Sequence, residues 1–415
     1  MIKSVTISKQ AVYPFMMVFL GLLVLVVVNG LTTSALSVFD EELLKEFDIK
    51  IRTNLRYKES ITNFISAIFI VLAGGFVDKF KVKSSILIGL TFLTLGFFIY
   101  AHAATIYFVY LAHFCLGIAL ITAGSMPIII LVSTWFIQKR GFALGFALLG
   151  TSLGGFVFPP ILSHFIAEYG WRNTFLILMI LPVVLIFLIL FFLKNSPRDL
   201  GLLAFGEQIN EESNQSEPII QSGLSYKNAL KTSTFWIISL CGFLSFFSVV
   251  SIVSNLFLHL RGFDFDPKQA SYSLSIYFGF SLLGKLLISS LSDYIDTFKV
   301  FTICALGMAC GSLLFWTMNP AIIFQAVGLT ALSWGGIYTL YNLMIVKNFG
   351  LKSAGKINGT ISSFESLGSF IAPIATGFLY THNHNSYKTA FLVVTIALTI
   401  TTVLSFFFRR NQVAN

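Results

Sequence analysis

Long apolar runs, rather than short amphipathic patches, dominate the chain. Each run is close to the roughly 20 residues that a helix needs to cross the hydrocarbon core of a bilayer. Twelve runs can be marked, at residues 13–39, 59–78, 84–101, 105–134, 141–165, 173–193, 233–258, 269–292, 298–317, 320–346, 356–380 and 387–408. The pattern predicts an all-α membrane protein with twelve transmembrane helices.

One long polar stretch separates the sixth run from the seventh. It includes EQINEESNQSEPIIQSG, which is charged, rich in Ser and Asn, and without periodicity. Such composition is typical of a linker. We therefore expect an N-terminal six-helix bundle at 1–194, a cytoplasmic linker at 195–231 and a C-terminal six-helix bundle at 232–415.

The two halves of the chain repeat weakly. Matching residues recur 214 or 215 positions apart, as Asp78 and Asp293, Gly145 and Gly359, Gly154 and Gly368, and Pro159 and Pro373. A parallel repeat of this kind predicts two pseudo-symmetric bundles with a solute path between them.

The composition excludes a soluble protein. Of the 415 residues, 56% are hydrophobic and only 11% are charged, against about 25% charged residues in soluble domains. The net charge of +9 comes from basic residues scattered between the apolar runs, which argues against a nucleic-acid partner. The four cysteines lie inside apolar runs and form no CxxC pair, so we expect no disulfide, no metal and no cofactor.

Basic residues also predict the orientation. With both termini in the cytoplasm, the inside segments hold seventeen of the 27 Lys and Arg residues and the outside segments hold nine. The first outside loop, at residues 40–58, has five basic residues that are balanced by five acidic ones. The first run is too long for a signal peptide. We expect a monomer in a cytoplasmic (inner) membrane of the bacterial type.

Lys285 is the most informative single residue. It begins the stretch GKLLISSLSD, and Asp293 marks the aqueous end of that run. The intervening helix is about 12 Å long, which places Lys285 near the middle of a core roughly 30 Å thick. A cation there is costly unless it faces a cavity or an anion. We predict that Lys285 binds the solute; the alternative is that it snorkels or pairs only with protein.

The stretch GGFVDKFKVK follows the second run. It resembles the G-x-x-x-D-R-x-G-R-R loop between helices two and three of the major facilitator superfamily, although a lysine replaces the second glycine. The resemblance implies that fold, and it implies a gating role at the ends of helices two and eight, whereas an ordinary charged turn is the alternative. The residues concerned are Gly74, Asp78, Lys79, Lys83 and Asp293.

Further stretches indicate a branch of that superfamily. WFIQKRGFALGFALLGTSLGG, GWRNTF, NSPRDLGL and GKLLISSLSD resemble segments of monocarboxylate porters and oxalate/formate-type antiporters. The resemblance implies that Lys285 meets a substrate carboxylate and that Lys139 and Arg140 take part in gating. Independently of family, the glycines at 141, 145, 150, 154, 355, 359 and 368 should form close-packing helix faces.

Glu365 lies near mid-depth in the eleventh run. It could exchange a proton as the path opens to either side, or it could form a static pair with Lys285. At this place the antiporters have a second basic residue, so Glu365 argues against a dicarboxylate held between two cations. His113 is a candidate proton relay, and a hydrogen-bonded core histidine is the alternative.

We expect polar and aromatic residues to line the rest of the substrate site, although packing could explain the aromatic ones. They are Asn29, Asn255, Trp334, Tyr338, Tyr341 and Asn342.

The sequence predicts a secondary active transporter of a small organic anion (a carboxylate) or a zwitterion. It would work by alternating access and couple to protons. A larger carboxylate metabolite such as a carboxylate siderophore, an amino acid, or a sensor on the same fold are the alternatives. HExxH, GxSxG and Walker motifs are missing from the sequence, so we do not expect an enzyme.

Overall fold

The computed structural model describes residues 2–79, 81–207, 223–292, 294–350 and 353–408, without the side chains of residues 2–11, 69–79, 289 and 354. Helices make up almost all of the described chain, and its β-structure is limited to two isolated bridges.

The helices reproduce the predicted runs, with several of the runs divided into two elements. They are α1 (Ile2–Asn29) with η1 (Gly30–Ser34), α3 (Arg52–Lys79), α4 (Val82–Ala101), α5 (Ile106–Ala123) with α6 (Ser125–Trp135), α7 (Arg140–Leu148), α8 (Gly150–Leu178), α9 (Ile180–Phe192), α11 (Ser233–Arg261), α12 (Pro267–Leu291), α13 (Thr297–Trp316), α14 (Ile323–Phe349), α15 (Ala354–His382) and α16 (Lys388–Ser405).

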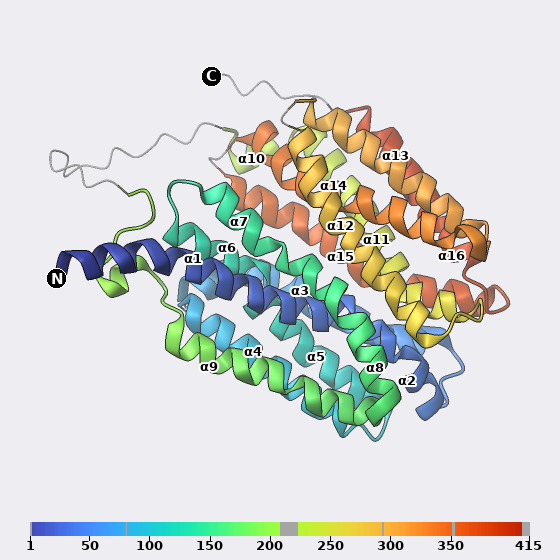
Figure 1. Cartoon of the computed structure of the whole chain (residues 1–415). Helices are drawn as coiled ribbons and strands as arrows, with labels where there is room; N and C mark the ends of the chain where they lie inside the picture. The colour runs from blue at the N-terminus through green and yellow to red at the C-terminus, as the bar shows by residue number, and fades with distance from the viewer. Residues whose placement is uncertain (1, 80, 208–222, 293, 351–352, 409–415) are drawn as a thin grey trace. The chain divides into compact units, whose positions relative to one another are not determined.

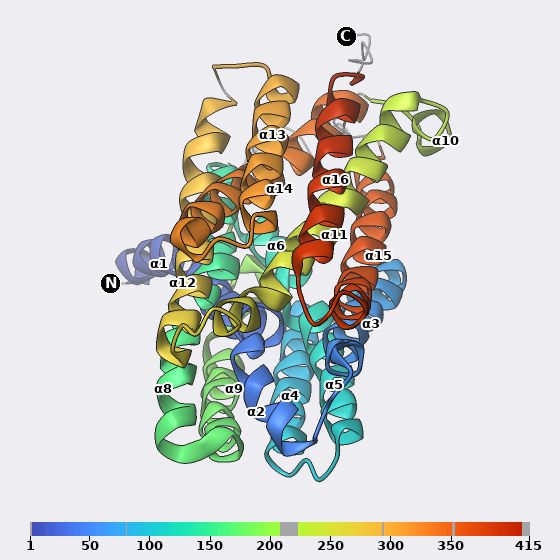
Figure 2. The ribbon, with the colours of Figure 1, turned by 90° about the vertical axis from the view of Figure 1, so that its right-hand side faces the viewer.

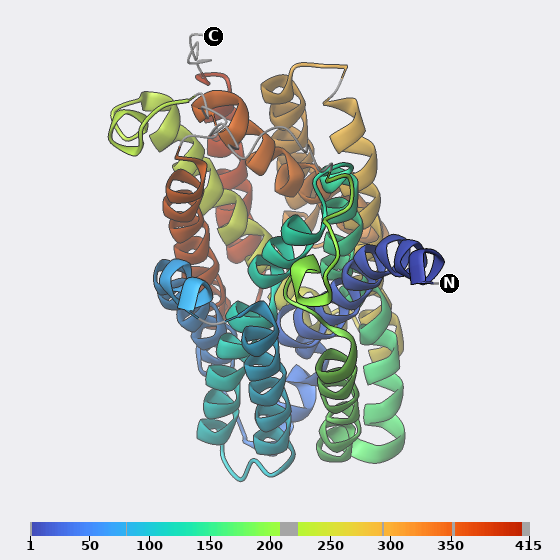
Figure 3. The same cartoon turned by 90° about the vertical axis from the view of Figure 1, so that its left-hand side faces the viewer.

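Within the described residues, nine helical stretches are long and apolar enough to span a membrane. One of them, Arg140–Phe192, contains two predicted spans because α8 reverses at Gly170, where φ is 75°. Figure 3 shows this reversal as the turn between two green helices. Helices α3 and α15 correspond to the two remaining predicted runs, and the described chain is almost entirely helical, so the predicted all-α fold is confirmed.

The helices pack into two compact units. The first comprises Met1–Ala35, Leu72–Phe158 and Phe165–Ile219. In this unit α1 packs against α5, α6 and α7, while α4 packs against α5 and α9 (Figure 1).

The second unit comprises Leu36–Val71, Pro159–His164 and Ile220–Asn415. Here α11 packs against α15 and α16, and α14 packs against α12 and α13 (Figure 2). Residues 36–71 therefore group with the C-terminal helices, although the repeat assigns them to the N-terminal half. The division at residue 194 into two moving bundles stays a proposal.

The connection after the first span differs from the predicted outside loop at 40–58. It contains α2 (Asp40–Glu46), and α3 already begins at Arg52. Arg56 and Lys58 are fully buried because each lies within ion-pair distance of Asp40 and Glu59. A hydropathy pattern does not show which charges are paired. It therefore places Arg56 and Lys58 in water.

The start of the linker is ordered against the first unit. The Trp135 indole donates to the Lys194 carbonyl at 3.2 Å, and the Phe205 amide donates to the Trp135 carbonyl at 2.8 Å. Between them, Pro197–Leu200 forms a 3-10 turn that ends at Gly201, with φ of 65°. Trp135, which begins one of the stretches that carry the family resemblance, thus contacts the residues on either side of another, NSPRDLGL.

The predicted glycine packing holds for only some of the positions. A Cβ on Gly150 or Gly154 would collide with α1, and one on Gly368 would collide with α11. For the other four the prediction is wrong within the part of the chain that the structure describes, because none of its atoms lies within 4 Å of a Cβ at Gly141, Gly145, Gly355 or Gly359.

Candidate functional site

A backbone contact between two helices positions Lys285. A Cβ on Gly284 would lie 3.2 Å from the Gly335 Cα and would overlap with the Leu332 carbonyl. Only glycine therefore allows α12 and α14 to approach this closely. One turn after Gly335, the Tyr338 ring faces α12, and the Lys285 Nζ lies 4.6 Å from its centroid. The half-buried lysine is thus held in a cation–π contact.

The other predicted lining residues of α14 do not share one environment. Trp334 packs edge-on against Phe246, with ring centroids 4.9 Å apart, and it neighbours Tyr338 at 6.0 Å. Tyr341 is buried against Phe301 at 5.3 Å, whereas Asn342 is exposed. Of these four residues Tyr338 contacts Lys285 directly, and substrate contact by any of the four stays a prediction.

Glu365 lies beside a close contact between α15 and α11, as Lys285 does between α12 and α14. A Cβ on Gly368 would lie 3.1 Å from the Phe247 amide nitrogen, so these two helices also meet at their backbones. One turn earlier on α15, the half-buried Glu365 side chain faces Gly242, whose Cβ would lie 3.1 Å from the Glu365 Cγ. Glu365 and Lys285 have different neighbours, so their pairing stays a prediction.

Asn29 lies at an irregular turn in the first unit. Directly after it, η1 adds a π-helical turn, a feature that is frequent at functional sites. A Cβ on Gly30 would lie 2.8 Å from the Gly154 Cα. The Asn29 Nδ2 is buried with no hydrogen-bond partner among the described residues. Because buried amides are normally satisfied, this donor is suited to a solute.

His113 is buried in the first unit and lies 2.6 Å from the Tyr100 hydroxyl. Tyr100 in turn stacks on Phe175, with ring centroids 4.1 Å apart. The geometry favours the hydrogen-bonded core histidine over the proton relay, which stays a prediction.

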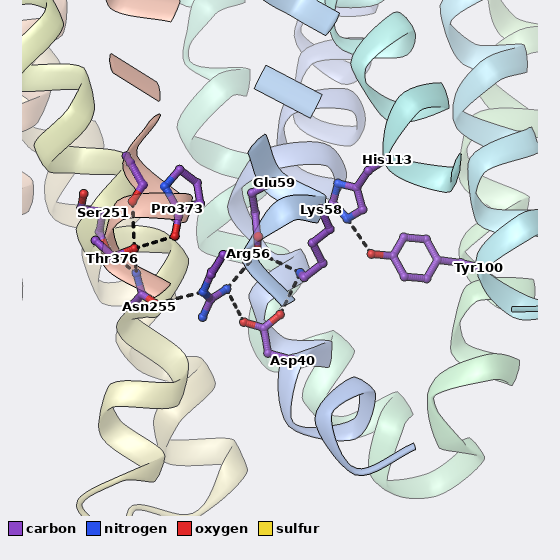
Figure 4. A network of polar contacts seen from close by, with 11 residues as sticks. Asp40, Arg56, Lys58, Glu59, Tyr100, His113, Ser251, Asn255, Pro373 and Thr376 are labelled. Carbon is purple, nitrogen blue, oxygen red and sulfur yellow. Dashed lines mark hydrogen bonds and ion pairs between the residues drawn. The ribbon is translucent and has the colours of Figure 1, made fainter. Parts of the chain in front are cut away.

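Four charged residues form a buried cluster in the second unit (Figure 4), and the sequence analysis missed it. The Arg56 Nη1 lies 2.7 Å from Asp40 and 3.0 Å from Glu59. The Lys58 Nζ lies 2.8 Å from Asp40 and 2.9 Å from Glu59. We call Asp40, Arg56, Lys58 and Glu59 the charged quartet. The balance of acids and bases within residues 40–58 was the available signal.

Asn255 contacts this quartet instead of facing an open site. Its Oδ1 accepts from the Arg56 Nε at 3.0 Å, and its Nδ2 donates to the Ser251 carbonyl at 2.8 Å and to the Thr376 hydroxyl at 3.0 Å (Figure 4). Its predicted role in substrate binding stays a prediction.

The predicted gating residues are only partly visible. The Lys83 amide donates to the Asn195 side chain at 2.9 Å, and its Nζ donates to the Leu190 carbonyl at 2.6 Å. Lys139 caps α7 with φ of 54°, and the Arg140 Nε donates to the Ser133 hydroxyl at 2.9 Å. Asp293 lies outside the described residues. Gly74, Asp78 and Lys79 lie in the part of α3 that is described by its backbone alone.

Metal-binding groups do not converge in the described chain. No three of its His, Cys, Asp and Glu side chains come together in a way that could hold an ion. The thiols of Cys115, Cys241 and Cys304 are buried, and that of Cys310 is exposed.

Comparisons with known proteins agree with this architecture. The family model described as "Major Facilitator Superfamily" matches residues 22–373, and a second match covers residues 238–414. The D-xylose-proton symporter structure superposes with a TM-score of 0.77 at 15% identity, covering 97% of this chain and 100% of the symporter. At this low identity, the likeness to the symporter structure shows the fold alone.

Several curated relatives are transporters. The uncharacterized MFS-type transporter YhjX of Escherichia coli (strain K12) is 23% identical over 340 residues, which are 80% of each chain. The glycerol-3-phosphate transporter of Bacillus subtilis (strain 168) is 24% identical, over 55% of this chain and 54% of the relative. A probable nitrate transporter, NarT, of Staphylococcus carnosus (strain TM300) is 22% identical, over 56% and 54%.

The chain thus spans about half the length of the last two relatives. The family model covers most of the chain, and this match together with the transporter relatives indicates a membrane transporter rather than an enzyme. The chain belongs to the major facilitator superfamily.

Proposed function

We propose that this transporter carries a small organic anion or a zwitterion by alternating access, with Lys285 as the counter-charge for the solute. The proposal rests on one observation: Lys285 belongs to a spanning helix, and its ammonium group lies over the Tyr338 ring. Burial of a cation in a membrane is costly and is typical of a substrate or ion path. The names of two relatives, which refer to glycerol-3-phosphate and nitrate, support a preference for anions.

A carboxylate is the anion that we favour. A lysine ammonium binds as a compact point charge and lacks the planar fork of arginine, so it suits a single carboxylate. An amino acid is the second candidate, because Glu365 supplies a half-buried acid in the same unit. A larger carboxylate, such as a siderophore, stays a further alternative.

Protons are the proposed coupling ion, and Glu365 is the group that we expect to exchange them, with His113 as a second candidate. We further propose a monomer in a cytoplasmic membrane of the bacterial type, with both termini in the cytoplasm. The excess of basic residues in the proposed inside segments supports this orientation.

The experiment is counterflow in proteoliposomes, after a thermal-shift screen of organic acids and amino acids has identified a solute. Lys285→Ala should abolish binding of that solute. Lys268→Ala is the matched control, since Lys268 lies exposed near the start of the same helix. Unchanged affinity in Lys285→Ala would remove Lys285 from the site.

Coupling is measured in the same vesicles. Glu365→Gln should lose uptake driven by a pH gradient and keep exchange at equal pH. Gradient-driven uptake at the rate of the parent protein would exclude Glu365 as the proton site.

A further inference from the structure

Residues 36–71 are fastened to α11 and α15 by polar contacts of the second unit. The Arg56 Nε donates to the Asn255 Oδ1, as described above. The Arg261 guanidinium binds the Glu41 carboxylate through two contacts of 2.6 and 2.9 Å. Arg52 lies over the Tyr380 ring, 4.7 Å from its centroid. The segment thus meets two C-terminal helices mainly through side chains that bear charge.

Two hydroxyl and amide contacts continue this row along α15. The Ser60 hydroxyl donates to the Phe370 carbonyl at 2.9 Å, and the Asn63 amide donates to the Ser369 carbonyl at 3.1 Å. The backbones come close at Gly377 of α15, where a Cβ would lie 2.9 Å from the Thr53 Cα.

Asn255 is fully occupied in this arrangement. Its Oδ1 serves Arg56, and both hydrogens of its Nδ2 are donated to Ser251 and Thr376. The side chain is 1% exposed. It therefore acts in this conformation as a receptor for the Arg56 guanidinium rather than for a solute.

The charged quartet makes this contact reversible. Its two cations and two carboxylates balance, and all four residues belong to residues 36–71. If the segment separates from α11, Arg56 keeps Asp40 and Glu59 and loses the neutral Asn255. Separation therefore leaves each buried charge of the quartet paired with a counter-charge. A buried charge without a partner would destabilise the separated state strongly.

We infer that the contacts Arg56–Asn255 and Glu41–Arg261 form a latch that closes the transporter on the side of the α1–α3 connection. This inference rests on the proposed alternating access, in which residues 36–71 move with the N-terminal half of the chain. The latch then breaks each time the path opens on that side. Arg56, Asn255, Glu41 and Arg261 are accordingly positioning residues of the transport cycle.

The test measures how often the buried latch becomes accessible, without any solute. Ser251→Cys is introduced after the four native cysteines have been replaced, and the protein is placed in nanodiscs, which expose both faces to a hydrophilic maleimide. Ser251 is 1% exposed, so labelling requires opening. Loss of a hydrogen bond to a charged group shifts an equilibrium by roughly tenfold or more. Asn255→Ala should therefore accelerate labelling by roughly tenfold.

Asn173→Ala is the matched control, because Asn173 makes one exposed bond to the Tyr169 carbonyl, and its labelling rate should equal that of the parent. An equal rate in Asn255→Ala would overturn the latch.

Charge reversal at the outer contact provides a second test that does not alter the buried quartet. Glu41→Arg and Arg261→Glu should each accelerate labelling, and the double variant should restore the slow rate. A double variant that labels as fast as the single ones would also overturn the latch. Since labelling needs no solute, a latch that passes both tests would stand even if Lys285→Ala kept its solute affinity.

Discussion

The charged quartet offers the most direct test of how this chain tolerates buried charge. In Asp40→Asn the carboxylate that lies 2.7 Å from Arg56 and 2.8 Å from Lys58 becomes a neutral amide of the same shape. Both cations then share Glu59 alone, and one positive charge is left in excess among fully buried side chains. Removing one member of a buried ion pair costs about 3–5 kcal/mol.

The measurement is the free energy of unfolding in mixed detergent–SDS micelles. A double variant, Asp40→Asn with Lys58→Met, removes the excess charge and should recover at least half of the loss. Asp48→Asn is the control, since Asp48 forms an exposed pair with Lys50 at 3.6 Å and adopts a positive φ that Asn accepts. The reasoning fails if Asp40→Asn is as stable as this control, or if the double variant is less stable than Asp40→Asn.

Two further predictions address pH and helix packing. The bond to Arg261, helped by Lys45, holds the pKa of Glu41 at about 2, well below its ordinary value near 4.5. A depressed carboxyl pKa stabilises the folded state above the ordinary value and loses this effect as the pH falls toward 2. The difference in melting temperature between the parent and Glu41→Gln should thus be constant from pH 5 to 8 and shrink below pH 4.5; a change between pH 6 and 8 would contradict this assignment. Gly335→Ala should destabilise by about 1–3 kcal/mol, since its Cβ would collide with the Ser281 carbonyl and the Lys285 amide. Gly145→Ala, with none of the described atoms within 4 Å of its Cβ, should be neutral or stabilising by up to about 1 kcal/mol, and equal melting temperatures for the two variants would refute the packing argument.

Run length and hydropathy were sufficient to predict the twelve spans, because a bilayer requires a fixed length of apolar helix. They did not predict where the spans bend. The π-helical turn after Asn29 and the reversal at Gly170 depend on single backbone positions that leave the hydropathy unchanged.

Arg56 and Lys58 show the second limit of sequence reasoning. Each is charged and lies within the predicted outside loop at residues 40–58, so a one-dimensional pattern places it in water. Their burial depends on Asp40, which approaches from the preceding helix, and on Glu59. Lys285 and Glu365 were easier to identify because each interrupts an apolar run, although the run does not reveal that Tyr338 and Gly242 are their neighbours.

Three candidate site residues share a structural setting that explains how solute contacts could be fixed without loops. Asn29 adjoins Gly30, Lys285 adjoins Gly284, and Glu365 lies one turn from Gly368. Each of these glycines lies where two helix backbones touch, against Gly154, Gly335 and Phe243 respectively. Such contacts fix the point at which two membrane helices cross. The position of a side chain within one turn of that point is therefore fixed by the helix crossing. Enlarging any of the three glycines should therefore displace the neighbouring polar side chain and weaken transport, even though a glycine offers the solute no side chain to bind.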